Sequence, residues 1–193
     1  HYKNVRSRLM GIPTLIKTLT ASGDSSLSFV HGAADVVFDS TYDEYMFVFT
    51  DIGPATDATA FQFQCSIDGG SNYNVTVTNT WFDAYNRETG DDTSLGYGTS
   101  YDQAQGTAFN YLARDIGNDA DSSAAGTLNI FSPASTTYVK HYYGRVHSHH
   151  SSDYAQDYFM AGYFNDADDD LNAIQFKMAS GNFDGVIQMY GIS

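Results

Sequence analysis

A histidine cluster is the densest group of potential metal ligands in the sequence. His147, His149 and His150 lie close together, with His141 upstream and Asp153 downstream. Imidazole nitrogens and carboxylate oxygens are suitable zinc ligands. In a strand, however, His147 and His149 share one face and His150 points to the other, so these residues alone make an awkward mononuclear site. The cluster is a weak metal candidate, and polar or pH-responsive surface histidines are the preferred interpretation.

The acidic run from Asp166 to Asp170 carries carboxylates that a calcium ion could use. It lacks the glycine at position six and the closing glutamate of an EF-hand loop, so a solvated acidic turn is predicted. The many aspartates could include the carboxylate pair of a glycosidase, but the sequence singles out none. It also has no Gly-x-Ser-x-Gly elbow and no glycine-rich phosphate loop opening a helix. We therefore predict no catalytic residue and no cofactor, and we predict that the chain is not an enzyme.

The segment Ser66-Ile67-Asp68-Gly69-Gly70-Ser71-Asn72-Tyr73 resembles the Asp-box turn of sialidase-like propellers. A propeller needs several copies of such a motif, and this chain shows one. The segment is interpreted as a β-hairpin in which the aspartate and glycines satisfy the turn. Cys65, just before it, is in phase with Phe61 and Phe63, which predicts a small buried side chain.

The elements that must position these residues are short strands. Period-two alternation, broken by clusters of Gly, Asp, Asn and Ser, dominates the chain after Pro13. The predicted strands are 14–20, 27–30, 45–50, 61–67, 74–85, 126–131, 137–146, 157–164, 173–178 and 185–192. Residues 45–49 are apolar on both faces, which predicts a central strand, whereas 174–178 alternate as if one face meets water. Arg87 to Asp121 is the least legible stretch, and its part from Tyr101 to Leu112 fits a short helix or a strand.

Composition excludes several classes of protein. The 193 residues carry a net charge of −14 with a pI near 4.4, which disfavours nucleic acid because phosphate binding needs clustered Lys and Arg. No apolar run reaches the length of a membrane span. The single cysteine rules out an intramolecular disulfide framework. High aromatic content and few charged residues favour sheets.

These observations predict an all-β, antiparallel fold with an arm or processed end at residues 1–13 and one β-sandwich domain at residues 14–193. Residues 1–9 carry Lys3, Arg6 and Arg8 in an otherwise acidic chain. This segment is interpreted as a basic arm that contacts an acidic neighbour or an underlying shell, with a tag as the alternative.

Three stretches together resemble small structural proteins of tailed bacteriophages, particularly marine ones. They are Leu15-Ile16-Lys17-Thr18-Leu19-Thr20-Ala21-Ser22, then Ser26-Leu27-Ser28-Phe29-Val30, then Phe38-Asp39-Ser40-Thr41-Tyr42. The C-terminal residues 174–177, 180–182 and 185–192 are similar to the closing strands of many phage tail and fibre-type domains. The resemblance implies a jelly-roll-like sandwich on the virion surface, commonly a homotrimer, of the decoration, head-fibre or tail-fibre type. Other virion proteins would then be its partners.

Other functions stay open at this point. A carbohydrate-binding or receptor-binding module, which would bind a host surface glycan, is the main alternative, because tyrosines and Trp81 offer flat faces for sugar stacking. A surface-glycan depolymerase is a less favoured alternative. Self-association is predicted in addition, since free sheet edges must be paired or protected and the many aromatics suit subunit interfaces.

Overall fold

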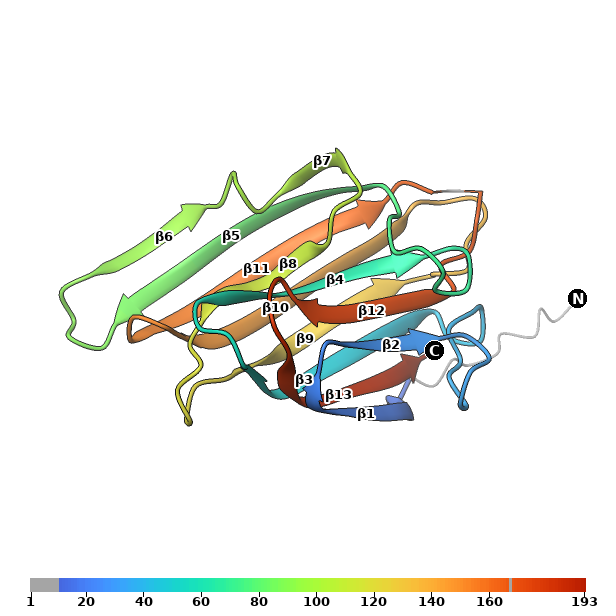
Figure 1. Cartoon of the computed structure of the whole chain (residues 1–193). Helices are drawn as coiled ribbons and strands as arrows, with labels where there is room; N and C mark the ends of the chain where they lie inside the picture. Colours follow the sequence, from blue (N-terminus) through green and yellow to red (C-terminus); the bar gives the residue numbers. More distant parts are fainter. Residues whose placement is uncertain (1–10, 167) are drawn as a thin grey trace, which may run out of the picture.

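The computed structural model describes residues 11–166 and 168–193, which form 13 β-strands (Figure 1). The strands are β1 (Thr14–Asp24), β2 (Ser26–Val30), β3 (Glu44–Pro54), β4 (Thr59–Ser66), β5 (Val77–Arg87), β6 (Thr93–Tyr97), β7 (Gln103–Gly106), β8 (Asn110–Ile116), β9 (Ala124–Phe131), β10 (Lys140–His150), β11 (Tyr154–Phe164), β12 (Ala173–Met178) and β13 (Phe183–Ile192). All the described strand pairings are antiparallel. The predicted all-β antiparallel class is confirmed.

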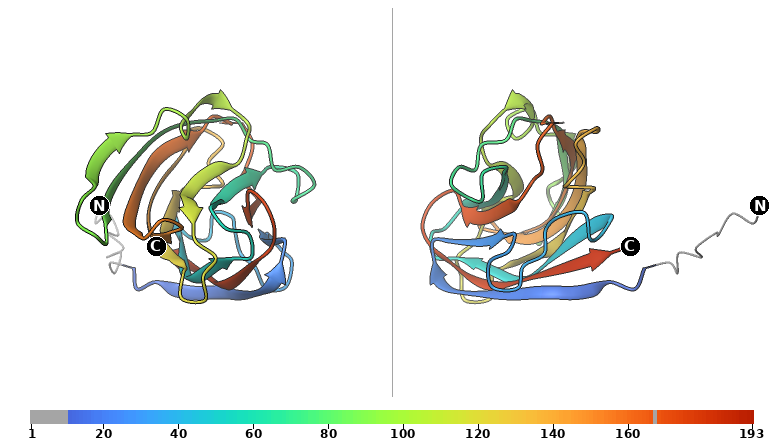
Figure 2. Two further views of the ribbon diagram at one scale, coloured as in Figure 1. Left: turned by 60° about the vertical axis from the view of Figure 1, so that its left-hand side comes forward. Right: turned by 90° about the vertical axis from the view of Figure 1, so that its right-hand side faces the viewer.

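The strands follow one hydrogen-bonded path, β1-β13-β3-β9-β10-β8-β4-β12-β2, from which β11, β5, β6 and β7 branch. The main sheet curls through 304°. Its nearly closed, barrel-like shape can be seen in the two turned views of Figure 2. The expected pair of separate sheets is therefore not clearly present. The reason is that β10 connects both halves, which nothing in the local sequence pattern indicates. In the described part of the chain, no helix is long and apolar enough to cross a membrane.

The sheet splits at β10. This strand pairs with β11 along its whole length, from Lys140 to His150. On its other edge it pairs with β9 and, at its end, with β8 through the His150–Ile116 pair. The strands β11 and β8 therefore diverge from one point. The divergence leaves room between them for side chains from both.

The core is a cluster of aromatic rings between the facing parts of the sheet. Alternate residues of β3, β4 and β12 point inward because successive side chains of a strand face opposite sides. Phe176 of β12 lies among rings of β2, β3 and β4, with centroid separations of 5.3 Å to Phe47 and Phe49 and 6.0 Å to Phe61. Most of these ring pairs are tilted or edge-on, the arrangement that aromatic quadrupoles favour.

Several strand-level predictions are confirmed. The predicted strand 173–178 coincides with β12, and β3 lies between β13 and β9, so it is a central strand. Cys65 is fully buried, and burial raises the pKa of its thiol well above the usual value. In β10, buried and exposed residues alternate from Lys140 to His147. Period-two patterns are therefore reliable in strands that have one face on the core.

The stretch between Arg87 and Asp121, which has no clear strand pattern in the sequence, contains β6, β7 and β8. All five residues of β6 are exposed, so this strand has no buried face to create an alternating pattern. It pairs with β5 as an outer strand. The part from Tyr101 to Leu112 contains β7 and the start of β8, and no helix.

The predicted hairpin after Cys65 is wrong, although its turn chemistry is correct. Gly69 and Gly70 have positive φ angles. Asp68 accepts hydrogen bonds from the Asn72 backbone and side chain at 2.8 and 2.7 Å, and bonds to Asn72 and Ser66 lower the pKa of Asp68 to about 2. The flanking strands β4 and β5, however, pair with other strands and not with each other. The turn connects distant parts of the sheet.

The N-terminal arm can be followed only in part. Gly11, Ile12 and Pro13 precede β1, and Ile12 is largely exposed. The basic residues Lys3, Arg6 and Arg8 lie outside the described residues. The interpretation of residues 1–9 as a basic arm stays a prediction.

Candidate binding cleft

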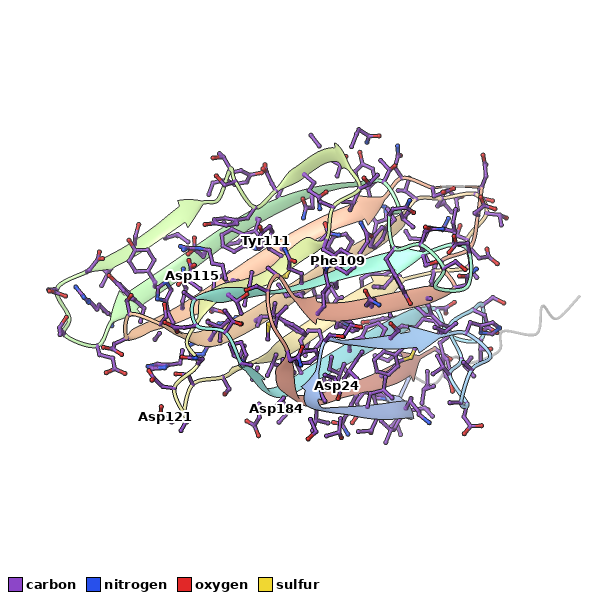
Figure 3. The ribbon with its side chains drawn as sticks, in the orientation of Figure 1. Asp24, Phe109, Tyr111, Asp115, Asp121 and Asp184 are labelled. Atoms are coloured by element: carbon purple, nitrogen blue, oxygen red, sulfur yellow. The ribbon has the colours of Figure 1, made fainter. Side chains whose placement is uncertain are left out.

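A cleft of about 310 Å³ opens where β8 and β11 diverge from β10. It is lined by Tyr85, Arg87, Asp92, Arg114, His150, Ser152, Tyr154 and Gln156. Figure 3 labels Asp115, next to Arg114 at the end of β8, in this part of the molecule. The cleft is therefore assembled from the ends of four strands, β5, β8, β10 and β11.

Strand periodicity explains why β5 and β11 direct polar side chains into the cleft. On β5, the inward positions continue from Trp81 through Asp83 and Tyr85 to Arg87, at intervals of two residues. The antiparallel register places Tyr85 opposite Gln156 of β11. Residues that face the apolar core in the middle of these strands thus give way to polar residues where the strands leave the core.

Arg114 organises the charged floor of the cleft. Its two terminal nitrogens contact the carboxylates of Asp83 and Asp115 at 3.2 and 2.5 Å. The buried Gln156 amide also donates to Asp83. The Tyr158 hydroxyl donates to the Arg114 backbone carbonyl at 2.6 Å. These bonds fix both the backbone and the side chain of Arg114, so the floor is pre-organised.

An aromatic wall stands beside this floor. The rings of Tyr85 and Tyr154 are perpendicular, with centroids 5.3 Å apart. The Arg87 guanidinium lies 5.3 Å from the centre of the Tyr154 ring, within cation–π range. The Tyr154 hydroxyl donates to Asp92 at 3.0 Å. The wall therefore combines apolar ring surface with a donor and an acceptor at its edge.

His150 connects the wall to the floor. Its Nδ1 accepts a hydrogen bond from the Ser152 backbone N–H at 3.0 Å, which leaves the proton of a neutral ring on Nε2. That Nε2 lies 3.7 Å from a carboxylate oxygen of Asp115. Interaction with His150, followed by the hydrogen bond and charge of Arg114, lowers the pKa of Asp115 despite the opposing effect of burial. Asp115 is therefore ionised at neutral pH.

The charges of the cleft are close to balance. Arg87, Arg114 and Asp92 are the charged residues that line it, while Asp83 and Asp115 pair with Arg114, and Asp91 lies 3.9 Å from Arg87. An anion would compete with these paired carboxylates for the guanidinium groups, and a cation would meet the guanidinium groups. Donors, acceptors and ring faces side by side instead suit a neutral ligand with several hydroxyl groups, whose oxygens both donate and accept hydrogen bonds.

The three candidate metal ligands of the sequence do not meet at one site. His147 is exposed on the outer face, and His149 contacts Ser122 Oγ at 2.7 Å and lies 3.6 Å from Glu88. His150 instead lines the cleft. Within residues 11–166 and 168–193, no group of three or more potential ligands could hold a metal ion. The prediction that His150 points to the opposite face from His147 and His149 is confirmed. The sequence did not indicate that His150 lines a cleft.

The acidic turn that contains Asp166 and Asp169 binds the side-chain ammonium group of Lys140. The fully buried Lys140 donates from Nζ to the backbone carbonyls of Asp166 and Asp169. Burial lowers the pKa of Lys140, and the nearby aspartates oppose this effect. The turn is therefore more than a solvated loop, because a buried ammonium group organises its backbone.

Sequence reasoning also missed Arg87, Arg114, Tyr85 and Tyr154. One signal was present: Arg114 follows Tyr-Leu-Ala in a chain with nine Lys and Arg residues in total. A scarce cation within a strand-like segment suggests an ion pair or a site. Its partner Asp83, and the Gln156 that bonds to Asp83, come from other strands, and the sequence does not indicate which strands are neighbours.

The carboxylate of Asp115 is expected to make the fold less stable in acid. Its folded-state pKa is lowered, so its contribution to stability is complete above the unfolded value of about 3.9 and is lost as the pH falls through the folded value. Denaturant unfolding of the wild type and of Asp115→Asn at a series of pH values measures this contribution. The wild type should lose more stability below about pH 4 than the variant does. Parallel pH curves would contradict the assignment.

Comparison with models of protein families, with curated proteins and with solved structures found no match for this chain.

Proposed function

We propose that the chain is a non-enzymatic protein of a bacteriophage virion surface whose cleft binds a neutral saccharide of the host surface. The observation that carries the binding function is the combination of the Tyr85–Tyr154 wall with the balanced floor around Arg114. Pyranose rings present apolar C–H faces to aromatic rings and hydroxyl groups to polar side chains. A cleft with both kinds of partner is suited to such a ligand.

Binding is favoured over hydrolysis by the state of the carboxylates. A glycosidase needs a carboxylic acid with a raised pKa to protonate the leaving group. The pKa of Asp115, which pairs with the cleft residue Arg114, is lowered instead. Asp83 is engaged by Arg114 and Gln156. Both groups are therefore better suited to hold a position than to transfer a proton, which disfavours the depolymerase alternative.

The virion location is supported by the resemblance of the first and last strands to small phage structural proteins. The stretches that carry it belong largely to β1, β2, β12 and β13, which lie in one half of the fold. A jelly-roll-like unit that assembles as a homotrimer would present the opposite half, with β5, β6 and the cleft, to the host. The role is then decoration, head-fibre or tail-fibre display with a part in attachment.

A glycan array followed by titration of the bound glycan tests the binding function. We expect a neutral oligosaccharide to bind, and Tyr154→Ala to weaken its binding by about tenfold, or about 1.4 kcal/mol, because the ring face and the bond to Asp92 are both lost. Tyr143→Ala is the matched control, since Tyr143 is an exposed ring on the outer face of the adjacent strand β10. Absence of any neutral glycan among the ligands, or equal losses in both variants, would exclude this site.

Purified particles test the virion assignment separately. The chain should co-purify with the particle in a fixed ratio, and imaging should place it on the surface. The same glycans, incubated with the chain, report on the enzyme alternative. Release of new reducing ends would replace the binding role with a depolymerase.

A further inference from the structure

Two buried hydrogen-bond donors near the cleft have no acceptor. The indole Nε1 of Trp81 and the guanidinium Nε of Arg114 have no hydrogen-bond partner within the described part of the chain. Trp81 is fully buried on the inward face of β5, two residues before Asp83. Arg114 uses its other two nitrogens for Asp83 and Asp115 and also lines the cleft. The two donors are thus next to the charged floor.

Both side chains lie against the ring of Tyr101. The Tyr101 ring centroid is 4.6 Å from that of Trp81, and it is 5.2 Å from the Arg114 guanidinium carbon. Tyr101 belongs to the connection between β6 and β7. Gly98 in this connection donates to the Trp81 carbonyl at 2.9 Å, and a Cβ at Gly98 would meet the indole ring at 2.3 Å. The connection therefore covers the indole directly.

A buried donor without a hydrogen-bond partner makes the fold less stable, because it lost its hydration on folding and gained no bond in return. Such groups are rare in native proteins, and each one calls for an explanation. Here both side chains that carry these donors lie against the same partly buried ring, in a connection between two short outer strands. Displacement of that ring by a group with acceptor oxygens would satisfy both donors at once.

We propose that the space held by the Tyr101 ring is an inner subsite of the cleft, in which Trp81 and Arg114 donate hydrogen bonds to the oxygens of a sugar residue. Tyr101 occupies this subsite in the unliganded chain and leaves it when the ligand enters. The indole and the Arg114 Nε donate and do not accept, so the ligand supplies acceptors there. Trp81, Tyr158 and Tyr111 provide ring surface around this space. The inference rests on the proposed saccharide binding and names the part of the site that would select the ligand.

The chain has one tryptophan, so the indole N–H gives a single, assigned NMR signal. We would titrate D-glucose, D-galactose and N-acetyl-D-glucosamine separately into wild type, Tyr101→Ala and the outer-face control Tyr143→Ala. The signals of the indole N–H and of the His150 ring would be followed together. At least one sugar should shift the indole signal. Tyr101→Ala should bind that sugar about tenfold more tightly, as expected when the open state of the connection is a minor population.

Hydrogen exchange of the indole N–H in the unmodified chain keeps the test independent of any variant. The sugar that shifts the signal should slow this exchange, because the proton becomes bonded to the ligand. An indole that responds to none of the sugars in wild type or in Tyr101→Ala overturns the inner subsite, and an internal N–H contact with the Tyr101 ring then accounts for the donor. In that case, a response of His150 alone leaves the proposed function intact. No response at either residue counts against both.

Discussion

Replacing Phe176 with alanine is expected to lower the free energy of unfolding by about 3–5 kcal/mol, the usual cost of removing a fully buried phenylalanine ring. The ring is fully buried and has neighbours on three strands. Its centroid lies 6.2 Å from that of Phe29 and 6.4 Å from that of Phe63, in addition to the closer rings of β3. These neighbours belong to a curved sheet and cannot all move into the space, so a cavity would remain.

Phe82→Ala is the control for this substitution. Phe82 is 39% exposed on the outer face of β5 and stacks on Phe159 with centroids 4.9 Å apart. We expect it to cost about 0.5–1.5 kcal/mol, the usual strength of an aromatic pair. Denaturant unfolding gives both values, and the slope with denaturant should stay constant. Equal losses would show that Phe176 is not the centre of the core.

Replacing Arg114 with methionine is expected to cost about 3 kcal/mol, at the lower end of the range for breaking a buried ion pair by removal of one partner. Asp83 is buried, and Gln156 would be its remaining partner in the floor. The Arg114 side chain is 22% exposed, so water screens part of the loss. The variant should also lose saccharide binding, because the floor of the cleft would carry an unbalanced negative charge.

A second substitution tests whether an unpaired carboxylate causes the loss of stability in Arg114→Met. Asp83→Asn in the Arg114→Met background removes the more buried of the two carboxylates that lost their partner, and it should recover part of the lost stability in a double-mutant cycle. Arg145→Met is the matched control, since Arg145 pairs with Asp157 on the outer face and its side chain is 66% exposed. Exposed pairs contribute at most about 1 kcal/mol. A loss at Arg145 as large as that at Arg114 would contradict the assignment.

The location of the strands could be predicted from the sequence because strand periodicity is a local property. In β12, Ile174, Phe176 and Met178 are buried while Gln175 and Lys177 are partly exposed, as the alternation predicts. The same argument predicted that Cys65 is buried and that His150 points away from its two neighbours. The pattern was missing in β6, where every residue is exposed. Local prediction therefore ended where a strand no longer had one face on the core.

The sequence by itself determined the all-β class, most strand positions, the acidic character of the chain and the chemistry of the Asp68 turn. The tertiary structure decided which strands are neighbours, and with that the nearly closed sheet and the cleft. Asp83 meets both Arg114 and Gln156 only because β5, β8 and β11 converge where the sheet splits at His150. The physical reason is that alternation depends on residues two positions apart, whereas strand pairing depends on the free energy of the whole core.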